Sequence, residues 1–227
     1  MITSIRVHTQ VRRATVVMFT AALTACAPTS TQMRTQPLYG WVVDHTEDPY
    51  GQSINIVIPP NAPSIQARYR PAPVPTEQGN FLGVHAGIDI SGNIGDPIIA
   101  AAAGTVVVSK SSRVWGNMVR IDHGPDENGR DVQTLYVHLD KRLVESNARV
   151  QRGQQIGTMG ITGLTAGNPT HLHYVVYTAP HRELSGKWQS ANPHLYWADG
   201  IGIVTCYDPS RYVPEQPLRM TYPVPCR

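Results

Sequence analysis

The sequence predicts an all-β protein made of short antiparallel strands. Its 227 residues include 19 Gly and 19 Pro, and few stretches repeat apolar residues at a helical period. β-branched or alternating runs are instead bounded by turn-forming residues, which is the pattern of strands joined by tight turns. We therefore expect sheets rather than helices in the folded part of the chain.

Residues 1–25 are expected to be an export signal. Three arginines precede an apolar stretch from Ala14 through Ala25, which is too short to span a bilayer comfortably. Leu23-Thr-Ala-Cys26 resembles a bacterial lipobox, which implies that Cys26 is lipid-modified and becomes the mature N-terminus. The alternative is ordinary cleavage after Ala27. The lipobox implies a lipid-anchored exported protein, at the periplasmic face of the outer membrane if the cell has two membranes.

The charge balance excludes one class of partner. The chain carries 19 Lys+Arg against 16 Asp+Glu, and removal of the three signal arginines leaves 16 (19 − 3) against 16. A nearly neutral mature chain is not expected to bind nucleic acid through general basicity.

Residues 26–80 are expected to be a tether followed by an extension that contains a strand. In Ser53–Ile58 the residues Ile54, Ile56 and Ile58 alternate with their neighbours, so one face of this strand is apolar. We expect that face to pack on the domain that follows. The Pro-rich run 70–75 then predicts an extended connection.

Further strands are expected between residues 81 and 177. The strands with the clearest signals are 87–90, 104–109, 118–123 and 132–138. The last two flank Asn128-Gly129, a strong turn signal. Alternation along 132–138 places Tyr136 and His138 on one face, so Tyr136 is expected to share the surface of His138 and to be able to touch substrate. The glycines of 153–163 are interpreted as fold requirements.

Histidines and one aspartate suggest a metal site. His171 and His173 are two residues apart in an apolar run, so a strand would send both imidazoles to one face. His85 and Asp89 are also an even number apart, next to a predicted strand. Imidazole nitrogen and carboxylate oxygen are zinc ligands. Two His, one Asp and no Cys leave one tetrahedral position open, as in catalytic zinc sites. With His138 counted, two histidines are then left for proton transfer.

These phrases resemble the lysostaphin-type (LytM-like, family M23) zinc endopeptidases of bacterial cell walls. The resemblance covers roughly residues 81–198 and rests on His85-Ala-Gly-Ile-Asp89, Tyr136-Val-His138-Leu, His171-Leu-His173 and a Gly-rich frame. It implies that His85, Asp89 and His173 hold Zn²⁺ and that His138 and His171 are the catalytic pair. It also implies a small antiparallel β-sheet or sandwich of LytM type, like the duplicated hybrid motif, with an open groove, and peptidoglycan cross-links as substrate.

Cys206 and Cys226 lie in the remaining segment, a C-terminal extension of residues 199–227. In an oxidising exported compartment we expect them to form a disulfide. The alternative is two free thiols recruited to the metal.

Other readings stay open from the sequence. The chain could be a non-hydrolytic activator of a cell-wall amidase, although such relatives often lack site residues that are present here, or a carboxypeptidase that trims terminal D-alanine. Residues 38–80 could act as a lid, with Asn80 or His45 in the open coordination position. His123 is expected to form hydrogen bonds near the site. The scissile bond and the oligomeric state are not predicted.

Overall fold

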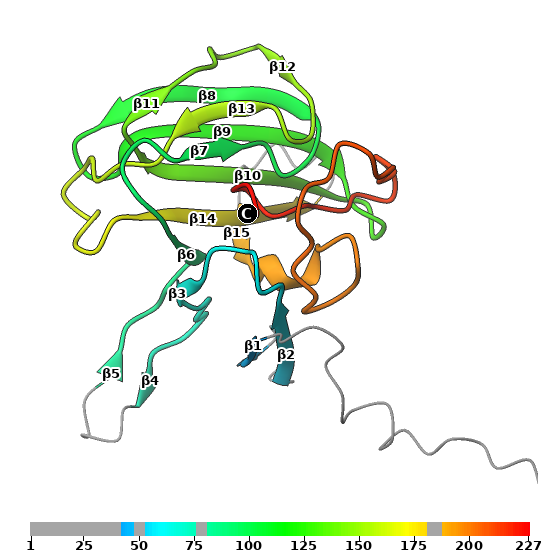
Figure 1. Cartoon of the computed structure of the whole chain (residues 1–227), viewed down its shortest axis with the longest axis horizontal. Helices are drawn as coiled ribbons and strands as arrows, with labels where there is room; N and C mark the ends of the chain where they lie inside the picture. Colours follow the sequence, from blue (N-terminus) through cyan, green and yellow to red (C-terminus); the bar gives the residue numbers. More distant parts are fainter. Residues whose placement is uncertain (1–41, 48–52, 76–80, 181–187) are drawn as a thin grey trace, which may run out of the picture. The chain divides into compact units, whose positions relative to one another are not determined.

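The structure is a computed structural model that describes residues 42–47, 53–75, 81–180 and 188–227 (Figure 1). The predicted signal peptide 1–25, Cys26 and Asn80 lie outside the described residues, and so does the side chain of His45. The lipid anchor and the lid therefore remain predictions.

The main sheet contains eight strands and is antiparallel throughout. Its order is β12 (Arg149–Val150), β8 (Gly104–Ser112), β9 (Gly116–Pro125), β10 (Arg130–Leu139), β14 (His171–Pro180), β6 (Ile88–Ser91) and β3 (Ile65–Ala67), and β15 (Gln189–Ala191) also pairs with β14. All four predicted strands named above lie within or overlap these elements. The long central strands give the sheet two faces, one apolar and one that carries the site.

A smaller sheet packs on the apolar face. It contains β11 (Lys141–Arg142), β13 (Gln155–Thr158) and β7 (Pro97–Ile99) and overlies β8–β10 in the view of Figure 1. Ile98 and Ile156 of this sheet join Val119, Ile121 and Tyr136 of the main sheet in one buried cluster. Burial of these side chains is the main source of stability for the two layers.

The predicted strand in the N-terminal extension is present as β2 (Ser53–Ile58), which pairs with β1 (Val42–Glu47). Ile54, Ile56 and Ile58 are buried, as their alternation predicts. The backbone of Val57 is bonded to the C-terminal extension: it donates to Gly202 O at 2.9 Å and accepts from Val204 N at 3.0 Å. The N-terminal extension was expected to pack on residues 81–198. It also forms backbone hydrogen bonds with residues 199–227.

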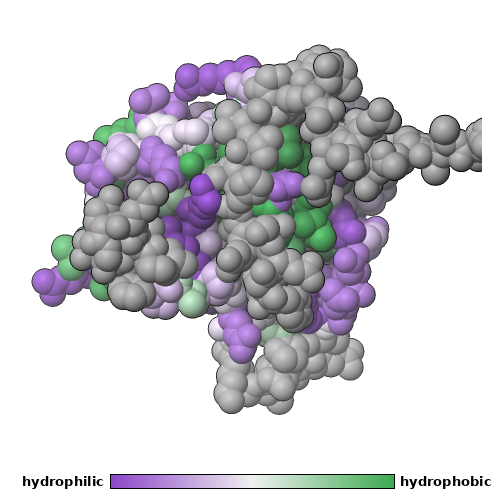
Figure 2. Space-filling view, turned by 90° about the horizontal axis from the view of Figure 1, so that it is seen from below, coloured by the Kyte–Doolittle hydropathy of each residue, from purple (hydrophilic) through white to green (hydrophobic). Residues whose placement is uncertain are grey.

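Two further short strands, β4 (Val74–Pro75) and β5 (Phe81–Leu82), form a pair after β3. Figure 2 views the molecule from the side on which β1–β5 lie in Figure 1. Among the described residues, hydrophilic ones dominate the outer parts of this side, and the hydrophobic ones gather near its middle (Figure 2).

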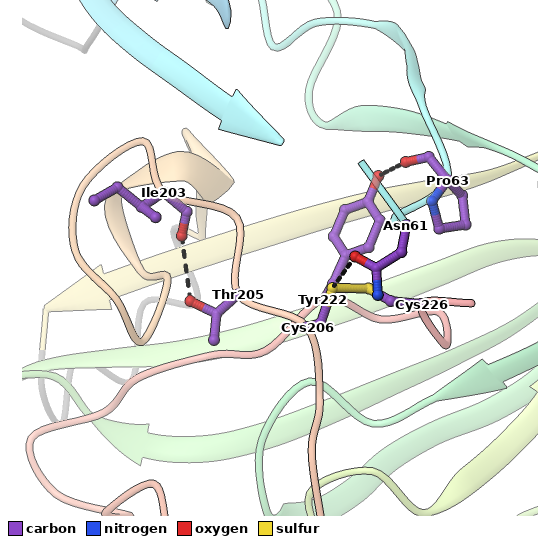
Figure 3. Close-up of a disulfide and its surroundings, with 7 residues drawn as sticks. All are labelled: Asn61, Pro63, Ile203, Thr205, Cys206, Tyr222 and Cys226. Atoms are coloured by element: carbon purple, nitrogen blue, oxygen red, sulfur yellow. Dashed lines mark hydrogen bonds between the residues drawn. A yellow bond between two sulfur atoms is a disulfide. The ribbon is translucent and has the colours of Figure 1, made fainter. Parts of the chain in front are cut away.

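The C-terminal extension is part of the core. Leu218, Met220, Tyr222 and Val224 are almost completely buried. Cys206 and Cys226 form the expected disulfide, with 5.9 Å between their Cα atoms. Figure 3 shows Asn61 and Pro63 of the N-terminal extension beside it, where Tyr222 donates a hydrogen bond to Pro63 O at 2.9 Å. The two extensions therefore meet at the disulfide.

The all-β prediction is confirmed. Within the described ranges, the helical structure is the 3-10 turn η2 (Pro193–Leu195). No helix in that part of the chain is long and apolar enough to cross a membrane.

Candidate metal centre

Two neighbouring strands bring an aspartate and a histidine together. Asp89 on β6 is the register partner of His173 on β14. Residues opposite each other on adjacent strands point to the same face. His85 precedes β6 and is held by Arg70, since each donates its backbone N–H to the other's carbonyl at 2.9 Å.

Three ligand atoms converge at this point. His85 Nε2 lies 3.1 Å from Asp89 Oδ1 and 3.1 Å from His173 Nδ1, and His173 Nδ1 lies 2.7 Å from Asp89 Oδ1. Tetrahedral zinc ligands at about 2.1 Å from the ion are about 3.4 Å apart, so the observed spacing is close to that of a zinc site. Among the described residues, these three side chains form the group whose ligand atoms lie close enough together to hold a metal ion.

The protonation pattern of the cluster fits a cation. His85 Nδ1 lies 2.6 Å from Arg68 O, which can only accept, so Nδ1 carries the proton and Nε2 presents a lone pair. Burial acts to raise the pKa of Asp89, but its interactions with the adjacent His173 and His85 outweigh burial and hold that pKa well below its usual range, so the Asp89 carboxylate is ionised. The cluster is therefore a set of lone pairs that repel unless a proton or metal ion lies among them.

His138 reaches the site from β10 through a break in the strand. The β10–β9 register shifts between Tyr136 and Leu139, and His138 has φ +66°. A non-glycine residue in this left-handed region costs about 1–3 kcal/mol and persists only where its surroundings hold it. The irregularity turns the His138 ring toward His171, with 5.2 Å between ring centroids.

The same irregularity makes the Tyr136 prediction wrong. Tyr136 is the register partner of Tyr174, is completely buried in the core cluster and accepts a hydrogen bond from Ala101 N at 2.9 Å. Strict alternation would place Tyr136 and His138 on one face. Because the strand is irregular at His138, the tyrosine faces the core and the histidine faces the site.

His138 and His171 present the same nitrogen to the site. His138 Nδ1 lies 3.0 Å from Thr162 O, and His171 Nδ1 lies 2.9 Å from Pro169 O, so both Nδ1 atoms are donors and both Nε2 atoms carry lone pairs. His171 Nε2 lies 3.7 Å from Asp89 Oδ1. Burial lowers the pKa of His138, so its neutral form is favoured near pH 7. Two imidazoles that present Nε2 beside a ligand cluster can accept and return a proton.

A pocket of about 570 Å³ opens over the cluster. All five predicted site residues line it: His85, Asp89, His138, His171 and His173. Its rim includes Trp115, which is 42% exposed and lies parallel to the His173 ring at 6.1 Å between centroids. Gln66, Ala67 and Val84, from the segment around β3 to β5, line another part of the wall.

Sequence reasoning missed Trp115 and the Arg68 carbonyl. Trp115 immediately precedes Gly116 in the Gly-rich frame, and this position was the available signal. A backbone carbonyl leaves no signal, because any residue supplies one. His123, expected near the site, is instead buried on the other face: its Nδ1 donates to Ala103 O at 2.7 Å and its Nε2 lies 2.8 Å from Thr134 Oγ1.

Known proteins share this part of the chain. The sequence model of Peptidase family M23 matches residues 83–193. Peptidoglycan DD-endopeptidase ShyC of Vibrio cholerae is 42% identical over 93 residues, which make up 41% of this chain and 20% of ShyC. Murein hydrolase activator NlpD of Escherichia coli is 37% identical over 119 residues, which make up 52% of this chain and 27% of NlpD. The match thus covers 20% of ShyC and 27% of NlpD.

Solved structures are also similar to this chain. The catalytic domain of the antimicrobial peptidase lysostaphin from Staphylococcus simulans is 27% identical, covers 58% of this chain and 89% of that domain, and gives a TM-score of 0.44.

Proposed function

Residues 83–193 form a domain of peptidase family M23, and from this premise we propose that the chain is a zinc-dependent endopeptidase that hydrolyses peptide cross-links of bacterial peptidoglycan. The observation that carries the proposal is the convergence of His85, Asp89 and His173 beside two further histidines. These two, His138 and His171, are not part of the group that could hold a metal ion. A purely structural zinc site would use four protein ligands and would need no neighbouring bases.

We assign roles to the five side chains on this basis. His85 Nε2, Asp89 Oδ1 and His173 Nδ1 would hold the ion. A bound zinc ion supplies a Lewis acid for the scissile carbonyl and lowers the pKa of a water molecule. His138 and His171 accept the proton of the attacking water and deliver it to the departing amine through their Nε2 atoms. Their N–H forms also stabilise negative charge that develops on the carbonyl oxygen.

The pocket lining supports an endopeptidase over a carboxypeptidase. Among the described lining residues, Asp89 and the histidines are the ionisable groups, and no lysine or arginine is present. A terminal carboxylate would need a cationic partner in such a pocket. A peptide bond within a cross-link brings no such charge.

The test is digestion of purified peptidoglycan sacculi, with released fragments identified by mass spectrometry. The wild-type protein should release soluble glycan fragments whose attached peptides have the masses of a cut cross-link, and a chelator or His173→Ala should abolish release. Sacculi that stay intact with the zinc-loaded protein would contradict the proposal. Cleavage that removes only a terminal residue would favour a carboxypeptidase instead.

A second candidate is an activator of a cell-wall amidase. It is favoured by the NlpD similarity, which spans 52% of this chain against 41% for ShyC. An activator would raise release of glycan-free peptides only when a purified amidase is present. The complete set of site residues favours the hydrolytic function.

We also propose that the chain is exported and anchored through a lipid on Cys26, because residues 1–25 and the lipobox phrase have that pattern. In this proposal residues 26–80 are the tether and extension, 81–198 the catalytic domain and 199–227 a C-terminal extension. Labelling with a fatty-acid analogue should mark the wild type and not Cys26→Ala.

A further inference from the structure

The turn that carries His138 is held from two directions. The backbone N–H of His138 donates to Trp115 O at 3.3 Å, and its ring Nδ1–H donates to Thr162 O at 3.0 Å. Both the main chain and the imidazole are therefore tied to segments that are distant along the sequence. Because φ at His138 is +66°, the turn would not keep this shape without outside support.

The hydroxyl of Thr162 fixes the residues next to His138. It donates to Leu139 O at 2.7 Å and accepts from Asn117 N at 2.9 Å. Asn117 in turn donates its side-chain amide to Leu139 O at 3.1 Å and to Asp140 O at 2.9 Å. The side-chain hydrogen bonds of Thr162 and Asn117 thus end within two residues of His138 or join the pair together, apart from the bond that the Ser111 hydroxyl donates to the Asn117 amide oxygen at 2.6 Å.

The two supporting segments touch backbone to backbone. A Cβ on Gly116 would lie 2.2 Å from Thr162 O, and a Cβ on Gly163 would lie 2.3 Å from Gly116 N. Side chains at either position would force the segments apart. Asn117 and Thr162 therefore lie where the two segments are closely packed. Close packing is required to hold a neighbouring group in one place.

We propose that Thr162 and Asn117 are positioning residues that hold His138 Nε2 at a fixed place opposite the His85–Asp89–His173 cluster. The inference rests on the proposed hydrolytic function. Proton transfer requires the base to be placed to within a fraction of an ångström, and a small displacement lowers the rate much more than it changes binding. Loss of this support should therefore lower kcat and leave zinc content and KM unchanged.

The substitutions Thr162→Val, Thr162→Ser and Thr205→Val make a matched set. Valine keeps the shape of threonine and removes the hydroxyl, whereas serine keeps the hydroxyl. Thr205 is a control outside the pocket, because its hydroxyl also donates to a backbone carbonyl, Ile203 O at 3.2 Å, and accepts from a backbone N–H, that of Asp199 at 2.9 Å. We expect Thr162→Val to lower kcat about 10- to 100-fold, and the other two to stay within about threefold of wild type.

Several outcomes would overturn the inference. Thr162→Val with the wild-type kcat would do so, and so would an equal loss in Thr205→Val. Loss of zinc together with activity would show a general structural role. If Thr162→Val does not fold, Asn117→Ala removes two of the bonds to the turn and must show the same fall in kcat at constant KM and zinc content.

A second measurement does not depend on hydrolysis. In zinc-loaded protein with labelled histidine, the Nδ1–H of His138, identified by its absence in His138→Ala, should exchange slowly because Thr162 O accepts it. It should exchange at least about tenfold faster in Thr162→Val and should be unchanged in Thr162→Ser and Thr205→Val. An unchanged rate in Thr162→Val refutes the positioning role, whereas inactive wild-type protein refutes the proposed function.

Discussion

His173 and Asp89 are direct register partners across β14 and β6, and His173 Nδ1 lies 2.7 Å from Asp89 Oδ1. The pairing of two strands therefore determines that two of the three ligand atoms meet. A slip of one residue would send one of these side chains to the opposite face. The third, His85, is placed by backbone bonds rather than by strand register.

Substitution of a proposed zinc ligand and substitution of a proposed base should have different effects on zinc content. His173→Ala should lose zinc, because it removes one of three ligand atoms and leaves Asp89 without its closest partner. His138→Ala should retain about one zinc per chain and lose activity by about 100-fold or more, because His138 contributes a base and no ligand. Zinc content by elemental mass spectrometry, measured beside sacculus digestion, checks both. Retention of full zinc by His173→Ala would show that the ion is held elsewhere.

Two deletions should show which part of the N-terminal extension zinc binding requires. A deletion of residues 27–52 keeps β2 and β3, so zinc binding should persist. A deletion of residues 27–75 removes β3 and the Arg68 and Arg70 backbone groups that hold His85, and we expect zinc affinity to fall about 10- to 100-fold, as for other groups that orient a ligand. Isothermal titration with zinc measures the difference. Higher activity in the 27–75 deletion would instead support the lid.

Much of the site could be predicted because it follows the strand period. His171 and His173 alternate on β14, and Asp89 lies in a short apolar run, so simple periodicity brings them to one face. Cys206 and Cys226 could be paired because the signal expected in residues 1–25 predicts an oxidising compartment. These features depend on local pattern or on simple counting.

The rest depends on contacts that leave no mark in the sequence. Tyr136 was assigned to the wrong face because an irregularity at His138 breaks the alternation, and nothing in the residue types of β10 marks it. The role of residues 65–70 was missed because Arg68 acts through its carbonyl. The bonding of β2 to residues 202–204 was missed because a strand pattern shows only that an apolar face must be covered. It does not show which segment covers that face.

The disulfide should stabilise the fold without taking part in the chemistry. It closes a loop with a sequence separation of 20 residues, and such a loop contributes about 3 kcal/mol to the free energy of unfolding. The double variant Cys206→Ser with Cys226→Ser should therefore unfold at lower urea concentration and keep its activity under conditions where it stays folded. Reduced wild-type protein is the matched comparison. An unchanged unfolding midpoint would show that buried Tyr222 and its neighbours hold the segment alone.

Acid should destabilise the protein through His123. Burial lowers the pKa of His123 to about 4, although its hydrogen bond to Ala103 O acts in the opposite direction. The unfolded state, with the ordinary value of 6.5, binds the proton first. The free energy of unfolding is therefore unaffected by His123 above pH 6.5. It decreases as the pH falls toward 4, by up to about 3 kcal/mol. Urea unfolding of wild type and His123→Gln between pH 7 and 4.5 should show a flatter pH dependence in the variant.

Trp115 should determine how tightly substrate binds. Its ring is 42% exposed at the pocket rim, and its position is fixed by the main chain, since Trp115 O accepts from His138 N at 3.3 Å. A rigid exposed indole offers a flat apolar surface beside the cluster, and contacts of this kind contribute about 1 kcal/mol or more. Trp115→Ala should raise KM for a soluble cross-linked peptide about tenfold and leave kcat within about threefold.

The controls for Trp115 follow from its backbone role. Trp115→Phe keeps an aromatic surface and should recover most of the affinity, and Tyr212→Ala removes another exposed aromatic side chain that is not among the pocket residues. Because alanine retains the carbonyl that accepts from His138, a fall in kcat at constant KM would indicate that the indole positions the base and does not bind substrate.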